Sequence, residues 1–197
     1  MKQVQDHYFR KAKQSGYAAR SAFKLEQIDR KHRLLRAGQH ILDLGAAPGS
    51  WMQVAAERVG PRGLVVGIDL QPITAALPDH AVRLQGDVAD LDASRLPPDA
   101  APFQGIMSDM APRTTGIPSA DAARSAELVL QALALAERWL APGGFLLAKV
   151  FQGSRLPELR QSFRERFDKA SLEKPKASRQ ESVEIFLLGL GYRGTHA

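Results

Sequence analysis

The chain has 197 residues, of which 44% are hydrophobic and 24% charged, so it can bury a core and has the size of one globular domain. It contains no cysteine, which excludes disulfides, thiolate metal sites and thiol nucleophiles, and no metal site is expected. With no apolar run long enough to span a membrane and no apolar secretory signal at its start, we expect one soluble domain, residues 1–197, in the cytoplasm.

The net charge of +6 is concentrated at the beginning of the chain. Residues 1–36 contain ten Lys/Arg and three Asp/Glu, with Arg10, Lys11, Lys13 and Arg20 among the basic ones. Such a segment suits a polyanion, because neutralised phosphates release condensed counterions. Charge alone is equally consistent with a solvated basic arm.

Residues 18–35 have the spacing of an amphipathic helix. Apolar residues recur there at intervals of three and four, and the polar side chains Arg20, Lys24, Gln27 and Lys31 lie on a different face. The pattern predicts a helix with a basic outer side.

From His40 onward, short β-rich runs alternate with helical segments. The predicted strands are HILDL at 40–44, LVVGID at 64–69, VRLQGD at 82–87, FQGIMSD at 103–109 and FLLAKVF at 145–151. Helices are predicted from about residue 50, over 121–140 and near 155–168. The alternation predicts an α/β fold with a parallel, doubly wound sheet flanked by helices.

Composition also assigns one long helix, a polar loop and a closing strand. The Ala/Leu-rich helix at 121–140 is interpreted as core packing alone, ending at Ala-Pro-Gly-Gly, residues 141–144. Residues 170–182, ASLEKPKASRQES, have the polar, proline-containing composition of a loop, and VEIFLLGLGY at 183–192 reads as a closing strand.

A small-residue loop follows the first predicted strand. It runs from Asp43 through Gly45 and Gly49 to Trp51, and small residues there let a ligand approach the backbone. Its G-A-A-P-G sequence lacks the G-x-G-x-x-G spacing that places a pyrophosphate on a helix N-terminus. Asp43 instead favours a cationic ligand, and S-adenosylmethionine carries both a sulfonium and an ammonium group.

Aspartates also end the next two strands. Asp69 lies at the usual distance for a side chain that binds the adenosine ribose, and Asp87 ends the third strand in the same way. Any one of these aspartates could be a turn former or a helix cap. Three at successive strand ends favour a ligand site, which Trp51 would border.

Ionisable residues interrupt three apolar strands. Asp109 ends the fourth, Lys149 lies within the fifth and Glu184 within the last. Because a buried charge without a partner is costly, these side chains should meet one another or line a cleft. Lys24 of the first predicted helix would complete a set of two cations and two anions.

These residues stand in blocks that resemble the FtsJ/RrmJ-type ribosomal RNA 2′-O-methyltransferases over nearly the whole chain. The blocks are SGYAARSAFKL at 15–25, DLGAAPGSW at 43–51, SDMAP at 108–112, Lys149 in its strand, and KPKASRQESVE at 174–184. One small departure is Ser50, where many members of the family have glycine.

The resemblance implies a Rossmann-like, S-adenosylmethionine-dependent methyltransferase fold. It implies that Lys24, Asp109, Lys149 and Glu184 form a catalytic tetrad and that Gly49, Trp51, Asp69, Asp87 and Asp109 line the cofactor site. The implied partner is ribosomal RNA, within the large subunit, and the implied target is a uridine in the A-loop. A monomer is expected.

The side chains leave the role of Lys149 open. Methyl transfer from a sulfonium is an in-line displacement, so positioning of the 2′-oxygen supplies much of the rate. Lys149 either accepts the hydroxyl proton as a neutral base or, as the cation, orients the hydroxyl. Rival functions are a small-molecule O-methyltransferase, which the basic amino-terminal segment disfavours, and a non-catalytic RNA-binding factor, which the intact tetrad disfavours.

Overall fold

The protein is described by a computed structural model over residues 2–178 and 182–194. The helices are α1 (Lys2–Gln14), α2 (Ala22–His32), α3 (Ser50–Val59), α4 (Pro118–Trp139) and α5 (Leu156–Arg166), with single 3₁₀ turns at Val88–Asp90 and Ala93–Arg95. The strands are β1 (His40–Leu44), β2 (Leu64–Asp69), β3 (Ala81–Gln85), β4 (Phe103–Ser108), β5 (Leu140–Phe151), β6 (Phe167–Glu173) and β7 (Glu184–Tyr192).

The strands form one sheet in the order β3-β2-β1-β4-β5-β7-β6. Neighbours from β3 to β5 are parallel, while β7 pairs antiparallel with both β5 and β6. The expected α/β fold with a mostly parallel sheet is therefore confirmed. From β1 the chain adds β2 and β3 on one side and then β4 and β5 on the other, so the order of strand addition switches between β1 and β4. Ligands of such sheets bind beyond the carboxyl ends of the strands at this switch point.

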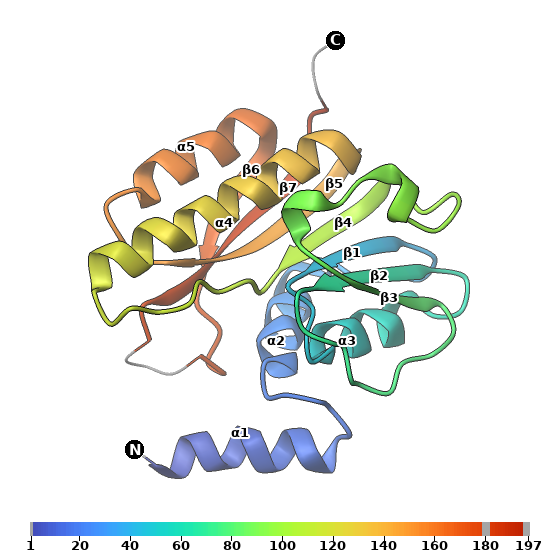
Figure 1. Ribbon diagram of the computed structural model, residues 1–197, viewed down its shortest axis with the longest axis horizontal. Helices are drawn as coiled ribbons and strands as arrows, with labels where there is room; N and C mark the ends of the chain where they lie inside the picture. Colours follow the sequence, from blue (N-terminus) through green and yellow to red (C-terminus); the bar gives the residue numbers. More distant parts are fainter. Residues whose placement is uncertain (1, 179–181, 195–197) are drawn as a thin grey trace.

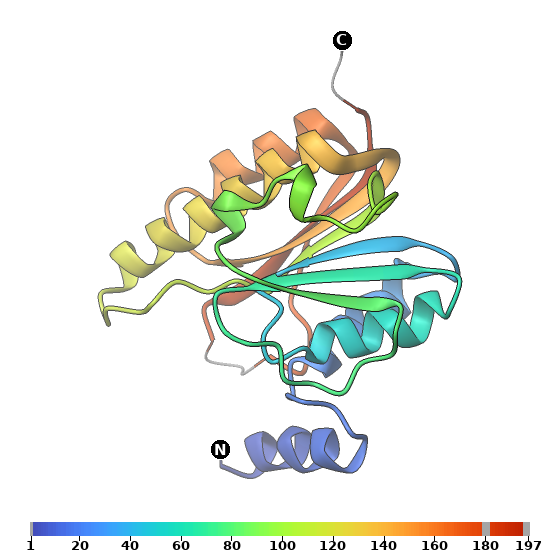
Figure 2. The same ribbon diagram turned by 45° about the vertical axis from the view of Figure 1, so that its right-hand side comes forward.

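Helices cover both faces of the sheet (Figure 1). One core contains residues of α4 and α5, among them Val129, Leu133 and Phe163, packed against the sheet. The other contains residues of α2 and α3, among them Leu25 and Val54. Both views place α1 beyond α2 and away from the sheet (Figures 1 and 2).

Two parts of the sequence prediction are wrong. Residues 167–173 form an edge strand, β6, where part was expected to belong to a helix and part to a polar loop. Only one edge of β6 is paired, and most of its side chains are at least partly exposed, so it lacks the apolar run that marks an inner strand. Strand β5 begins at Leu140 and includes the Pro-Gly-Gly segment that was expected to separate helix from strand.

The amino-terminal segment is also more ordered than an arm. Helix α1 contacts the body of the protein through Ala12, which clusters with Phe23 and Ala177, and through the partly buried Tyr8. Lys24 does not lie on a solvated outer face of α2 as the helical pattern suggested, because it is only 7% exposed. Part of the 174–184 block, residues 179–181, lies outside the described residues.

Candidate active site

A cavity of about 400 Å³ lies at the carboxyl edge of the sheet, beside the switch point. It is lined by residues that follow β1, β2, β3 and β4, and by two residues of α4. The lining residues are Gly45, Ala47, Asp69, Leu70, Asp87, Val88, Asp109, Met110, Ala111, Leu128 and Gln131. Its size is in the range of small-molecule sites.

The strand-end aspartates at this cavity also hold its backbone. Asp69 accepts hydrogen bonds from the N–H groups of Ala47, at 2.9 Å, and Gln71, at 2.8 Å. Asp87 accepts from the N–H of Ala89 at 2.9 Å and so caps the 3₁₀ turn that follows β3. Each aspartate therefore both stabilises a turn and lines the cavity. The interpretation as a turn former and the interpretation as a ligand-site residue are compatible.

Glycines in the loop after β1 permit close packing. Gly45 has φ +73°, and a Cβ there would lie 2.5 Å from the side chain of Met110. Gly49 begins α3 with φ +112°, and a Cβ there would lie 2.7 Å from the Cβ of Ala75. Gly45 therefore shapes the cavity wall, whereas Gly49 makes room for the 73–75 segment and is not among the lining residues.

Asp43 lies behind the cavity and is fully buried in β1. Neither of its carboxylate oxygens has a hydrogen-bond partner among the residues that the structure describes. Burial raises the pKa of this carboxyl well above its usual range, and the negative charges of Asp109 and Asp69 raise it further. A cation bound in front of these three carboxylates would relieve their mutual repulsion.

Trp51 also lies outside the cavity lining. It is 2% exposed, its Nε1 donates to the carbonyl oxygen of Ser21 at 2.9 Å, and its ring is 5.7 Å from that of Phe186. The hydroxyls of Ser21 and Ser50 lie 2.7 Å apart beside it. Trp51 therefore joins α3 to Ser21, which directly precedes α2 and lies three residues before Lys24.

Lys24 and Glu184 form a buried ion pair. The Lys24 Nζ lies 2.6 Å from the Glu184 Oε1, and the two side chains are 9% and 12% exposed. Ser178 donates its hydroxyl to the same oxygen at 3.0 Å. Burial alone would raise the pKa of Glu184, but Lys24, then Lys149 and Ser178, outweigh it and hold this pKa below its ordinary value.

Lys149 and Asp109 form the second pair. The Lys149 Nζ donates to the backbone carbonyl of Asp109 at 2.5 Å and lies 3.0 Å from its carboxylate Oδ1. The hydrogen bond is made to the backbone carbonyl, while the Oδ1 contact is an ion pair and this oxygen has no hydrogen-bond partner among the described residues. Lys149 also acts electrostatically on Glu184, so the four predicted residues form two ion pairs that lie near enough to influence each other.

Sequence reasoning missed several residues of this region. Ser178 lay in an expected loop and gave no signal. Leu70, Val88 and Met110 each directly follow a strand-end aspartate, which is a signal that could have found them. Helix α4 was interpreted as core packing alone, yet Leu128 and Gln131, three residues apart on one face, line the cavity.

Two negative findings apply to the described residues. Residues 2–178 and 182–194 contain no group of three or more His, Cys, Asp or Glu side chains arranged to hold a metal ion. No helix in the same ranges is long and apolar enough to cross a membrane.

Comparisons with known proteins identify the family of the chain. A family model described as FtsJ-like methyltransferase matches residues 17–192. A ribosomal RNA large subunit methyltransferase E from Nitratidesulfovibrio vulgaris is 50% identical over 196 residues, covering 98% of this chain and 96% of that protein. A protein of the same name from Syntrophobacter fumaroxidans is 48% identical over 191 residues, covering 96% and 97%.

Solved structures share the fold. A protein from Plasmodium falciparum, assigned as a ribosomal RNA methyltransferase, superposes with a TM-score of 0.77 and 27% identity over 90% of this chain and 100% of that one. Fibrillarin from Aeropyrum pernix, solved with bound S-adenosylmethionine, has a TM-score of 0.56 and 14% identity over 80% of this chain and 68% of that one. The second likeness concerns the fold alone.

Proposed function

The chain belongs to the FtsJ-like methyltransferase family, and from that premise we propose that it methylates a ribose 2′-hydroxyl of large-subunit ribosomal RNA with S-adenosylmethionine. The single observation that carries the proposal is the pairing of Lys149 with Asp109, a residue that also lines the cavity. Asp109 thus belongs both to the cavity lining and to the charged tetrad. We further propose a uridine of the A-loop as the target, a monomeric enzyme, and a cytoplasmic location.

The cavity residues fit S-adenosylmethionine. The unpartnered carboxyl of Asp43 lies close enough to Asp69 and Asp109 for their charges to raise its pKa, and a bound sulfonium or ammonium group would favour its ionised form. Leu70, Val88 and Met110 supply apolar walls for an adenine ring. Asp69 and Asp87 would hold the ribose side of the cofactor. When bound, the cofactor supplies a methyl group activated by the positive sulfur.

The tetrad would position the acceptor ribose. The two ion pairs hold Lys24 and Lys149 in fixed places, so their ammonium groups can donate hydrogen bonds to a 2′-hydroxyl without a costly rearrangement. Lys149 is the tetrad cation that pairs with a residue lining the cavity, and it would therefore act on the methyl donor's side of the site. Both roles of Lys149, general base and orienting donor, are compatible with its contacts to Asp109.

The basic surface of α1 would contact RNA phosphates. Arg10, Lys11 and Lys13 are exposed on this helix, and the Lys11 Nζ lies 4.8 Å from the centre of the Phe23 ring. That contact fixes the direction of one basic side chain relative to α2, the helix that carries Lys24. The amino-terminal charge is therefore attached to the catalytic region through packed residues.

Labelling with a methyl-labelled cofactor tests the function. Ribosomal RNA and large subunits would be taken from cells lacking the enzyme, labelled in vitro, and the product mapped by nuclease digestion and mass spectrometry. We expect one 2′-O-methylated nucleotide, and comparison of naked RNA with subunits identifies the preferred substrate. RNA binding without methyl incorporation at any cofactor concentration would instead support the non-catalytic factor.

A further inference from the structure

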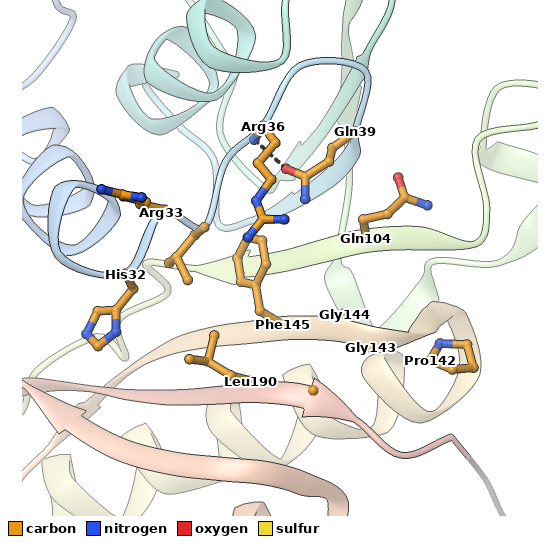
Figure 3. A pocket seen from close by; sticks show the side chains of 12 residues that line it. His32, Arg33, Arg36, Gln39, Gln104, Pro142, Gly143, Gly144, Phe145 and Leu190 are labelled. Atoms are coloured by element: carbon orange, nitrogen blue, oxygen red, sulfur yellow. Dashed lines mark hydrogen bonds between the residues drawn. The ribbon is translucent and has the colours of Figure 1, made fainter.

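A second cavity, of about 380 Å³, lies at the opposite end of the sheet from the tetrad. It is formed where β4 and β5 begin, by Gln104 and Phe145, together with the segment that joins α2 to β1 and the end of β7. Figure 3 shows the guanidinium of Arg36 pointing down toward the ring of Phe145, with Gln39 beside it and Leu190 on the far side.

The lining of this pocket is basic. It contains Arg33, Arg36 and His32 and no acidic residue. Within residues 2–178 and 182–194, neither arginine forms an ion pair, whereas His32 lies 2.9 Å from Glu173. Four arginines elsewhere in the described chain have a carboxylate partner, namely Arg58, Arg155, Arg166 and Arg193. Two uncompensated guanidinium groups at one pocket form an anion-attracting site.

The backbone holds Arg33 in a conformation that favours glycine. Arg33 ends α2 with φ +55° and ψ +51°, and its N–H donates to the carbonyl of Asp29 at 2.6 Å. Glycine or asparagine is usual at such a helix end, and another residue costs free energy there. Arg33 is one of the lining residues, three positions before Arg36, and Figure 3 shows its side chain directed away from the Phe145 ring.

An amide donor adds to the two arginines. The Gln39 Oε1 accepts a hydrogen bond from the backbone N–H of Arg36 at 2.7 Å, which fixes the orientation of the amide. The Gln39 Nε2 has no partner in the described part of the chain and remains available as a donor. Guanidinium and amide N–H groups together match the oxygens of a phosphate.

We propose that this pocket binds a phosphate group of the RNA backbone, at the opposite end of the sheet from the reacting ribose. The inference rests on the proposed function, because it assumes that RNA is the substrate. Arginine binds phosphate through two parallel hydrogen bonds and carries little hydration, which suits such a contact. A second contact would hold a large RNA in one orientation while the tetrad engages a single nucleotide.

The test compares two variants that each remove two positive charges. Arg33→Ala/Arg36→Ala removes the pocket arginines, and the control Arg160→Ala/Arg164→Ala removes two exposed arginines from α5. Affinity for a large-subunit ribosomal RNA fragment is measured across a salt series, with cofactor affinity as the folding control. Ultraviolet cross-linking with mass spectrometry locates the RNA on the wild-type protein, and inorganic phosphate is titrated separately.

We expect the pocket variant to bind the fragment about tenfold or more weakly at low salt, with a salt slope lower by between one and two units. The control variant should match the wild type, and cross-links should fall near residues 33–39. Unchanged RNA affinity and salt slope in the pocket variant would overturn the inference, also if inorganic phosphate binds the pocket, because the phosphate bound there would then not belong to the RNA. If the wild type methylates RNA in the labelling experiment described above, such a result leaves the proposed function intact.

Discussion

Replacing Lys149 tests the centre of the proposed site. Lys149→Ala removes the ammonium that lies 3.0 Å from the Asp109 carboxylate and donates to the Asp109 carbonyl. These side chains are 7% and 18% exposed, so the pair is nearly buried and its loss leaves an anion without its partner. Removing one member of a buried pair costs about 3–5 kcal/mol. Because Asp109 borders the cavity, where water can solvate it, we expect the lower end of that range.

A protein of ordinary stability survives this loss, since domains unfold with about 5–15 kcal/mol. We therefore expect Lys149→Ala to remain folded at 25 °C with a lower midpoint of urea denaturation and near-normal affinity for S-adenosylmethionine. Single-turnover methylation should fall by a factor of about a hundred or more, as for a removed acid–base or positioning group. The assay is incorporation of labelled methyl into saturating RNA with enzyme in excess.

Lys149→Arg separates the two roles of the lysine. Arginine stays protonated at working pH, so it cannot accept the hydroxyl proton but can still donate hydrogen bonds. Substantial single-turnover activity in this variant would favour the orienting cation, and loss of activity with retained cofactor and RNA affinity would favour the base. Methylation at the wild-type rate by Lys149→Ala would refute the reasoning altogether.

Three further outcomes follow from the same geometry. Asp69→Ala should weaken cofactor binding about ten- to a hundredfold in calorimetric titration while the protein stays folded, and unchanged affinity would remove this residue from the site. Deleting residues 1–14 should weaken RNA binding most at low salt and spare cofactor affinity; an unaltered salt slope would leave α1 without a role in RNA binding. Because the pKa of Glu184 is lowered in the folded protein, its pairing with Lys24 stabilises the fold above the ordinary glutamate pKa, and this contribution is lost as pH falls through the lowered value. In urea denaturation between pH 7 and pH 3, the advantage of the wild type over Glu184→Gln should shrink toward acid, and a constant difference would contradict this.

Strand positions were predictable because their signal is local. The runs at 40–44 and 64–69 are apolar and bounded by turn residues, and they coincide with β1 and β2. Aspartates at or just beyond the ends of β2, β3 and β4 mark the carboxyl edge of the parallel sheet, so several lining residues could be predicted without a structure. Strand β6 gave no such signal, because an edge strand with exposed side chains has no continuous apolar run.

Pairing within the tetrad could not be predicted in the same way. The apolar neighbours of Lys149 and Glu184 in the sequence indicate that both side chains need partners. Which anion pairs with which cation depends on how α2 packs, because α2 carries Lys24. Trp51 fixes that packing through its bond to the Ser21 carbonyl, and the helix then buries Lys24 against Glu184. Helical periodicity placed Lys24 on an outer face, because it contains no information about Ala177 and Ser178, which pack beside α2 and Glu184.

In the proposed mechanism, the position of Asp109 would hold the two substrates in register. In-line transfer requires the acceptor oxygen to lie close to the methyl carbon, and an error of about 1 Å is costly. Asp109 follows β4 at the switch point, lines the cavity, and contacts Lys149 on the adjacent strand β5 through both its carboxylate and its carbonyl. Because β4 and β5 are hydrogen-bonded neighbours, the separation between the cavity wall and the lysine is set by the sheet itself. In the proposed mechanism, the relative placement of methyl donor and acceptor would therefore depend on the pairing of β4 with β5.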